Sequence, residues 1–389
     1  MSAFDIDGQG CYVAALSALP GMGPAQLGAI LAGNSPREAW EAVLAGTIQR
    51  PRSQARGVGL SLDAEVVEGG SATSKPPWRL LASRVDPPVW WRSISQRGIS
   101  LTWRGRADYP SALCEDPSPP AAIFWRGRIE ALEAPCVAIV GTRNPTGGGV
   151  RVAREMGRDL TDAGVCVVSG LAKGIDGAAH RGALEALVSG VGAGPVAVVA
   201  SGVDVAYPKC HADLWERVAA AGAVISETLP GRAAQAWRFP ARNRVIAGLV
   251  RLLVVVESHR SGGSLITVEA ALQRGIDVRV VPGSVYSPAS AGSNQLLYEG
   301  AGPVRDASDV LDSLGVVRSS RSRTPLHGSL PVLDNAAQRV LDAVAWRPVT
   351  ANLLIADTGL SPPEVMRSLD VLVGSGVVAE EAGCYVRIR

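Results

Sequence analysis

Three loops contain the residues best able to bind an anion. Each follows an apolar strand-like stretch, contains glycines beside hydroxyl or cationic residues, and precedes a helix-like stretch. They are Gly141-Thr142-Arg143, Ser169-Gly170-Leu171-Ala172-Lys173-Gly174 and Ser261-Gly262-Gly263-Ser264. Glycine lets a phosphate approach the backbone closely, and N–H groups at helix starts favour anions. Open α/β sheets bind ligands outside the carboxyl ends of their strands, so the three loops predict a phosphate-binding site at one sheet edge.

Further cations and hydrogen-bonding side chains accompany these loops. Lys209 follows Tyr207-Pro208, and Arg242, Asn243 and Arg244 follow Phe239-Pro240. A helix that begins near Pro240 would carry Arg242 and Arg244 in its first turns, where arginine opposes the macrodipole unless an anion lies nearby. Arginine forks suit phosphate, and Tyr207 can stack on a base. This set is therefore typical of a protein that binds nucleic acid.

Two pairs of titratable residues leave a catalytic alternative open. Asp176 and His180 are four residues apart on a predicted helix, and Glu257 and Glu269 flank the last loop. We expect Asp176 to cap its helix and His180 to pack, because no third catalytic partner accompanies them. We expect structural roles for both glutamates. The sequence has no G-x-x-x-x-G-K-[ST] motif, which argues against ATP hydrolysis.

Strands and helices alternate from residue 136 onward. Val-rich strands separated by helices predict a parallel sheet that is covered on both faces. The expected strands are 136–141, 165–169, 196–201, 222–226, 251–257 and 277–282, with a final helix at 306–314. Two further candidate strands, 98–103 and 122–125, precede this alternation. The fold class is therefore α/β, with a Rossmann-like, doubly wound and mostly parallel sheet.

Smaller modules are expected on both sides of this sheet. Residues 12–45 have a helical pattern, interrupted by the turn Leu19-Pro20-Gly21-Met22-Gly23-Pro24. That turn resembles a helix-hairpin-helix turn, whose glycine N–H groups contact phosphate; an ordinary tight helix connection explains it equally. After an Arg/Ser-rich stretch, three helical patterns and two strands predict a winged helix. The expected divisions are a helical (helix-hairpin-helix/SAM-like) domain at 1–95, a Rossmann-like DNA-binding domain at 96–315, a linker at 316–333 and a winged-helix domain at 334–389.

Composition excludes several classes of protein. The 389 residues are 47% hydrophobic and 19% charged with a net charge of +2, so the chain can bury large cores and is not a polycation. Six scattered cysteines without a C-x-x-C pair, and four histidines, indicate neither a disulfide framework nor a zinc site. Asp5 and Asp7 are not followed by a signal-peptide core, and no apolar run reaches membrane-spanning length. We expect a cytoplasmic protein without a cofactor or a membrane partner.

The motifs together resemble those of the DNA-processing protein A (DprA/Smf) family. The resemblance covers roughly residues 100–305 and is specific because many motifs match in order. They are Val140-Gly141-Thr142-Arg143, Ser169-Gly170-Leu171-Ala172-Lys173-Gly174-Ile175-Asp176, Gly202-Val203-Asp204, Tyr207-Pro208, Ser226-Glu227, Phe239-Pro240-Ala241-Arg242-Asn243-Arg244, Val256-Glu257, Ser261-Gly262-Gly263-Ser264, Pro282-Gly283-Ser284 and Gly292-Ser293-Asn294.

The resemblance implies a non-catalytic protein that binds single-stranded DNA in a basic pocket and protects it. It also implies homodimerisation and loading of the RecA recombinase in natural transformation or homologous recombination. The candidate DNA-binding residues are Gly141, Thr142, Arg143, Ser169, Gly170, Lys173, Lys209, Arg242, Asn243 and Arg244, and a possible further phosphate site is formed by Ser261, Gly262, Gly263 and Ser264. In the C-terminal module, the acidic residues Glu364 and Asp370 outnumber Arg367 on helix 361–373, so we expect this module to contact protein, or DNA only weakly.

A second hypothesis is an enzyme that acts on a nucleotide phosphate. The run Ser261-Gly262-Gly263-Ser264, with Glu269 in the following helix, is similar to the glycine-rich motif of nucleoside-monophosphate phosphoribohydrolases. The Thr–Glu spacing differs, and the loop starts with Ser rather than Pro. Turnover of a nucleoside monophosphate to free base would distinguish this enzyme from a DNA-binding protein.

Overall fold

The computed structural model describes residues 8–49, 77–187, 192–316, 333–344, 348–375, 377–381 and 383–387. Contacts divide the chain into two compact units, Met1–Arg318 and Ser319–Arg389. Most of the predicted linker at 316–333 lies outside the described residues.

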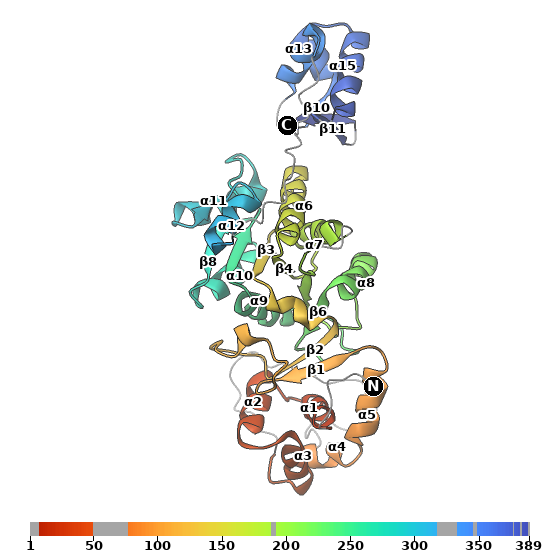
Figure 1. Ribbon diagram of the computed structural model, residues 1–389, viewed down its shortest axis with the longest axis vertical. Helices are drawn as coiled ribbons and strands as arrows, with labels where there is room; N and C mark the ends of the chain where they lie inside the picture. The colour runs from red at the N-terminus through yellow and green to blue at the C-terminus, as the bar shows by residue number, and fades with distance from the viewer. Residues whose placement is uncertain are drawn as a thin grey trace, which may run out of the picture. The chain divides into compact units, whose positions relative to one another are not determined.

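A nine-stranded sheet forms the frame of the first unit (Figure 1), with the order β1-β2-β6-β5-β4-β3-β7-β8-β9. The strands are β1 Ser100–Trp103, β2 Ala122–Gly127, β3 Cys136–Val140, β4 Cys166–Ser169, β5 Val196–Val198, β6 Ala223–Ser226, β7 Leu252–Val255, β8 Asp277–Val280 and β9 Gly302–Pro303. β3 to β9 are parallel, whereas β1 pairs antiparallel with β2, and β2 pairs antiparallel with β6. The predicted mostly parallel sheet is confirmed.

Helices cover both faces of this sheet. They are α6 Gly147–Asp162, α7 Ile175–Ala186, α8 Ala212–Ala221, α9 Arg238–Leu249, α10 Ser264–Leu272, α11 Ala291–Tyr298 and α12 Ala307–Leu314. Side chains alternate between faces along a strand. Val137 and Ile139 accordingly share a core with α6, α7 and α12, whereas Ala138 and Val140 share one with α9 and α10. The Val-rich strands are thus buried on both sides.

The strand order places a ligand crevice at β3 and β7. The chain steps from β3 through β4 and β5 to β6, and then returns to place β7 on the other side of β3. The loops that follow β3 and β7 therefore diverge at the carboxyl edge of the sheet. Such a switch in direction is where open α/β sheets bind ligands.

The N-terminal helices pack against the sheet rather than forming a separate core. They are α1 Gly10–Ser17, α2 Pro24–Gly33, α3 Pro36–Ala45, α4 Trp78–Ala82 and α5 Pro87–Ser95, and they gather beside β1 and β2 (Figure 1). Leu16 and Trp78 belong to the same buried cluster as Phe124 of β2 and Trp215 of α8. The segments on either side of residue 95 therefore build one compact unit.

Proline and capping residues divide the predicted helical stretch at 12–45 into three helices. Pro24 and Pro36 each occupy the first helical position, where the missing N–H has no helical acceptor. Ser35 and Glu38 form a capping box at the start of α3, with Ser35 N donating to Glu38 Oε2 at 2.9 Å.

The second unit is a winged helix. Its elements are α13 Asn335–Ala343, β10 Val349–Thr350, α14 Ala351–Thr358, α15 Pro362–Gly374, β11 Val378–Glu381 and β12 Cys384–Arg387. The strands form a sheet in the order β10-β12-β11, and Leu341, Leu354, Val365 and Leu369 bury their side chains in one core. The predicted winged helix is confirmed.

Membrane-spanning helices and metal-binding clusters are both absent from the described part of the chain. Among the described residues, no helix is both long and apolar enough to cross a membrane. Within the same ranges, no three His, Cys, Asp or Glu side chains are grouped so that they could hold a metal ion.

Candidate nucleic-acid interface

Two adjoining cavities lie at the carboxyl edge of the sheet. The larger, of about 680 Å³, is lined by the loop after β3, the first turns of α9 and the start of α10. The smaller, of about 200 Å³, is lined by the loop after β4 and the segment around Tyr207. Both are lined by Arg143, Phe239 and Arg242, so we treat them as one site, the edge pocket.

Two exposed cations line the edge pocket. The Arg143 guanidinium carbon lies 5.1 Å from the centroid of the Phe239 ring, and that ring lies 5.6 Å from the ring of Tyr207. Lys173 is exposed in the loop after β4 and lines the smaller cavity. Neither cation forms an ion pair within the described ranges. Both charges are therefore free to meet an anion.

Buried groups from three other elements hold the loop after β4 in shape. Gly170 N donates to Asp176 Oδ2 at 3.1 Å, and Gly170 O accepts a hydrogen bond from Arg242 Nη1 at 2.7 Å. His211 Nδ1 lies 3.0 Å from the carbonyl oxygen of Leu171, which has a φ of +53°. A non-glycine residue in this left-handed region needs such support from its surroundings. These contacts hold the backbone of the loop that presents Lys173 in one conformation.

Asp176 does not cap its helix, contrary to our expectation. The N-cap of α7 is Gly174, and Asp176 lies in the first turn, where its carboxylate accepts from Gly170 N in the preceding loop. Burial raises the pKa of Asp176, and the nearby Arg242 charge opposes that rise. The carboxylate therefore stabilises the loop and balances the buried Arg242.

Arg242 forms the floor of the edge pocket. Its side chain is only 8% exposed and donates to the carbonyls of Gly170 and Val198 and, through Nε at 3.0 Å, to Asn243 Oδ1. Burial lowers the pKa of Arg242 to about 10, while Asp176 acts in the opposite direction. Because this pKa lies well above 7, Arg242 is a positioned positive charge at neutral pH.

The glycine-rich loop before α10 closes the other side of the larger cavity. Gly262, Gly263 and Ser264 line it, and Ser264 Oγ lies 2.8 Å from Ser258 Oγ. Asn243 Nδ2 donates to Gly263 O at 3.5 Å, which links α9 to this loop. No side chain caps the first N–H groups of α10. Three of the four residues predicted to bind phosphate thus line the edge pocket, whereas Ser261 is exposed and does not line it.

Three of the candidate DNA-binding residues, Ser169, Lys209 and Arg244, lie outside the edge pocket. Ser169 is fully buried and donates to Ile139 O at 2.6 Å, within the sheet. Lys209 is exposed in a short 3₁₀ turn, Lys209–His211, and lines neither cavity. Gly141, Thr142 and Asn243, by contrast, line the larger cavity with Arg143 and Arg242.

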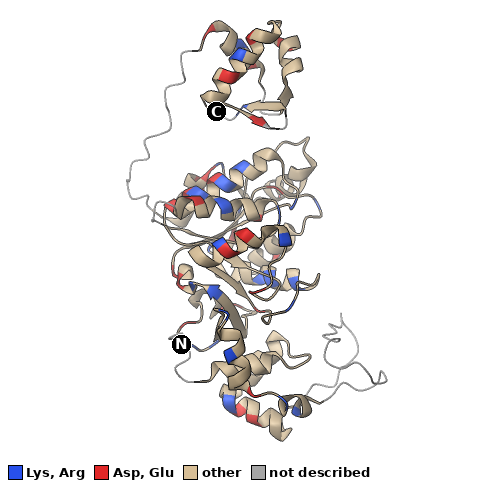
Figure 2. Ribbon diagram, turned by 90° about the vertical axis from the view of Figure 1, so that its right-hand side faces the viewer, with Lys and Arg blue, Asp and Glu red and all other residues tan. Residues whose placement is uncertain are grey.

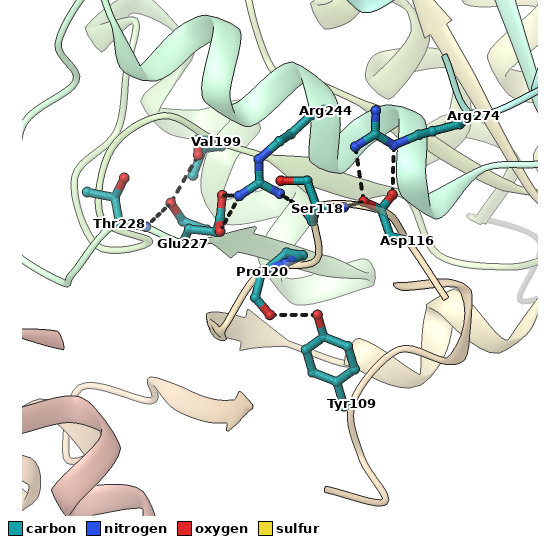
Figure 3. A network of polar contacts seen from close by, with 10 residues as sticks. Tyr109, Asp116, Ser118, Pro120, Val199, Glu227, Thr228, Arg244 and Arg274 are labelled. Carbon is teal, nitrogen blue, oxygen red and sulfur yellow. Dashed lines mark hydrogen bonds and ion pairs between the residues drawn. The ribbon is translucent and has the colours of Figure 1, made fainter. Parts of the chain in front are cut away.

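Arg244 is engaged in a scaffold contact. Figure 3 shows its guanidinium against Glu227, with Nη2 2.6 and 2.7 Å from the two carboxylate oxygens and Nη1 2.5 Å from Ser118 O. Burial raises the pKa of Glu227, and Arg244 opposes that rise. Nearby, Arg274 and Asp116 form a second buried ion pair at 2.7 Å. These pairs join α9 and α10 to the end of β6 and to the segment before β2.

The residues weighed for catalysis do not converge. His180 is fully buried, its Nε2 lies 3.3 Å from Val196 O, and burial lowers its pKa to about 4. Glu257 is buried and accepts from Thr146 N at 2.9 Å and from Thr146 Oγ1 at 2.7 Å, whereas Glu269 is exposed on α10. The expected structural roles of His180 and Glu257 agree with these contacts.

The contact between Tyr207 and Phe239 is the feature of the site that the sequence did not reveal. Tyr207 was expected to be able to stack on a base, but nothing in the spacing showed that Phe239, more than 30 residues later, would lie against it. The available signal was that each aromatic directly precedes a proline. Their contact is decided by how α9 crosses the carboxyl edge.

The basic character of the site is local. Figure 2 shows Lys and Arg interspersed with Asp and Glu along the helices in this view, in keeping with a net charge of +2. The edge pocket is distinguished instead by the absence of carboxylate partners for its exposed cations within the described part of the chain. This favours short-range binding of phosphate over long-range attraction.

A Rossmann-like sheet with a cationic, aromatic pocket at its carboxyl edge, joined to a C-terminal winged helix, defines a class of α/β proteins. Residues 100–315 match the family model described as DNA recombination-mediator protein A, and residues 324–372 match the DprA winged helix domain. The chain therefore belongs to the DNA recombination-mediator protein A (DprA/Smf) family, as the motifs predicted.

Two individual relatives support this family assignment. The chain is 32% identical to Protein Smf of Escherichia coli over 346 residues, covering 84% of this chain and 88% of that protein. It is 40% identical to DNA processing protein DprA of Streptococcus pneumoniae over 203 residues, covering 52% and 70%.

Two solved structures have a fold similar to that of this chain. The X-ray structure of DNA processing protein A from S. pneumoniae aligns with a TM-score of 0.55 and 35% identity, over 60% of this chain and 80% of that chain. DNA processing protein A from Helicobacter pylori aligns with a TM-score of 0.50 and 24% identity, over 56% and 95%.

Proposed function

We propose that this protein binds single-stranded DNA in the edge pocket and acts as a recombination mediator. The observation that carries the proposal is the gathering of Arg143, Lys173 and Arg242 around the ring of Phe239. Membership of the DNA recombination-mediator family supports it. A further support is that the H. pylori relative has been described by its single-stranded DNA binding mode.

Phosphate and base would be bound by different groups in the same pocket. The exposed Arg143 and Lys173 would contact successive phosphates, with the buried Arg242 charge below them. Tyr207 and Phe239 would stack on bases, which is tolerant of sequence because every base has a π face. The N–H groups at Gly141 and at the start of α10 would donate hydrogen bonds to a further phosphate. Contacts of this kind bind DNA without reading its sequence.

Single strands fit this pocket better than duplex. Stacking on Tyr207 and Phe239 requires unpaired bases, because the bases of a duplex are already stacked on one another. We include Gly170, Thr142 and Asn243 in the proposed site as loop and wall residues. Ser169 and Arg244 would affect DNA binding only by stabilising the fold around the pocket. Lys209 would contact only the part of a DNA strand that extends beyond the pocket.

The proposed activity is binding, not catalysis. His180 and Glu257 are buried and hydrogen-bonded to other parts of the chain, which supports a non-catalytic site. A panel of nucleoside monophosphates tests this point. No release of free base is expected, and release that depends on Glu257 would contradict the proposal.

We further propose that the protein forms a homodimer and loads RecA onto the bound strand in the cytoplasm. Exposed apolar side chains on α10 and α11, with Leu272 61% and Tyr298 88% exposed, support self-association. Light scattering should give twice the mass of the 40.3 kDa chain. RecA-driven strand exchange on DNA already coated by single-strand-binding protein should start sooner with this protein than without it.

Fluorescence anisotropy with labelled oligonucleotides tests the central proposal. We expect salt-dependent binding to single strands of mixed sequence and much weaker binding to the matching duplex. Equal affinity for both forms, or no binding at low salt, would contradict it.

A further inference from the structure

A third cavity adjoins the edge pocket. It has a volume of about 260 Å³ and lies between the turn Leu19–Pro24, which joins α1 to α2, and the ends of β5 and β6. Trp237 and Arg238 at the start of α9 also line it. We call this cavity the hairpin pocket. It shares Val199, Ala200 and Arg242 with the edge pocket, so the two cavities adjoin at these residues.

Arg238 is a buried cation without a carboxylate partner. Its side chain is 7% exposed, its guanidinium carbon lies 4.9 Å from the ring centroid of Trp237, and one hydrogen bond of 2.6 Å joins Nη1 to Ala233 O. A guanidinium has five N–H donors, so most of this capacity is not used by that bond. Within the described residues no ion pair is found for Arg238. A buried charge in this state is costly unless an anion meets it.

A second cation, Arg232, lines the same cavity. Arg232 is exposed and also lines the hairpin pocket, and the pKa of Arg238 is lowered by burial and then by the Arg232 charge. The carboxylate in the lining, Glu227, already accepts both of its hydrogen bonds from Arg244. Arg232 and Arg238 therefore face one cavity, and neither has an ion-pair partner among the described residues.

The other walls suit a nucleotide. The N-terminus of α2 lies at the cavity through Gly23 and Pro24, with no side-chain cap and no acidic residue in its first turn, which adds a positive dipole end. Leu19, Met22 and Leu229 contribute apolar surface. The volume lies slightly below the range of about 300–1,000 Å³ typical of pockets for drug-sized ligands, which suits one nucleotide and excludes a duplex.

We propose that the hairpin pocket is a second nucleotide subsite for the same DNA strand. Arg232 and Arg238 bind the phosphate, and the apolar wall between Met22 and Leu229 holds the base. This inference rests on the proposed function, because the strand must first occupy the edge pocket. It assigns the N-terminal helices a direct part in binding DNA, through the turn between α1 and α2.

A length series of oligothymidines tests the subsite. The variants are Arg232→Ala and Arg238→Gln, and the matched control is Arg251→Ala, since Arg251 is exposed and precedes β7 at the opposite edge of the sheet. The shortest oligomers that bind should have equal affinity for all four proteins. Longer oligomers should bind wild type and Arg251→Ala more tightly, and the two pocket variants should lose this gain. Each lost phosphate contact should reduce the log–log salt slope by about 0.7.

Crosslinking provides a measurement that does not depend on a variant. With oligomers that carry a photoreactive base, wild type should give a crosslinked peptide that contains Met22 when the strand is long, and not when it is short. If Arg232→Ala and Arg238→Gln match Arg251→Ala at every length, or if no crosslink reaches the 19–24 turn, the subsite is refuted. If Arg238→Gln folds poorly, Arg232→Ala decides, because that side chain is exposed.

The two proposals fail in different ways. Wild type that binds no single-stranded DNA refutes the proposed function itself. If wild type binds single-stranded DNA, and Arg143→Ala weakens that binding whereas Arg232→Ala does not, the proposed function stands and the subsite is refuted. Thymidine monophosphate that binds without competing with long oligomers also refutes it, because the hairpin pocket would then serve a free nucleotide.

Discussion

Replacing Arg143 and Lys173 together by alanine should weaken single-stranded DNA binding and flatten its salt dependence. Both side chains are exposed, both line the edge pocket, and neither has an ion-pair partner in the described ranges. Their removal should therefore leave the fold intact. Arg242 remains as a buried charge, held by the carbonyls of Gly170 and Val198.

The magnitude follows from counting phosphate contacts. Each contact to a single strand contributes about 0.7 to the slope of log affinity against log salt, so the double variant should lose about 1.4. Between about 50 and 200 mM salt, the fall in affinity should then be roughly sevenfold smaller than in wild type. A hydrogen bond to a charged group contributes about 1.5 kcal/mol, so affinity at low salt should fall roughly a hundredfold for the pair.

Anisotropy titrations across a salt series measure both quantities. The control is the double variant Arg92→Ala and Arg251→Ala, which removes the same charge from two exposed positions that do not line the edge pocket. The control should keep the wild-type slope within error. An unchanged slope in the Arg143 and Lys173 variant, or an equal change in the control, would refute the assignment of these cations to phosphate contacts.

Three further outcomes are expected. Phe239→Ala removes the ring that Arg143 and Tyr207 contact, and should weaken binding by about 1–3 kcal/mol in anisotropy titrations, while Phe239→Trp should retain most of it. Arg244→Ala leaves Glu227 buried and unpaired, so chemical denaturation should show a loss of about 3 kcal/mol in the free energy of unfolding, with DNA affinity of the folded protein unchanged. Burial lowers the pKa of His180 from 6.5 to about 4, so the folded protein holds this side chain neutral over a range in which the unfolded chain is protonated. The contribution of His180 to stability is therefore complete above pH 6.5 and is lost as the pH falls toward 4. Chemical denaturation across this range should show the free energy of unfolding dropping by about 3 kcal/mol in wild type and by less in His180→Gln.

Periodicity was enough to predict the sheet and most of its helices. The expected strand at 136–141 is observed at Cys136–Val140, and the expected final helix at 306–314 is observed at Ala307–Leu314. Two short elements were not predicted: α11, which has eight residues, and β9, which has two and exists through its pairing with β8. Such elements depend on distant partners, so local patterns do not reveal them.

The sequence by itself determined the family, the sheet class and the loops that reach its carboxyl edge, because these depend on local glycine spacing and on the two-residue period of buried strands. Only the tertiary structure decided what each cation does. Arg242 and Arg244 are two residues apart in one helix, yet Arg242 turns toward Gly170 in the edge pocket and Arg244 toward Glu227. Two residues on a helix point in different directions by more than half a turn, so each meets a different neighbour. Those neighbours come from distant strands, and no local pattern specifies them.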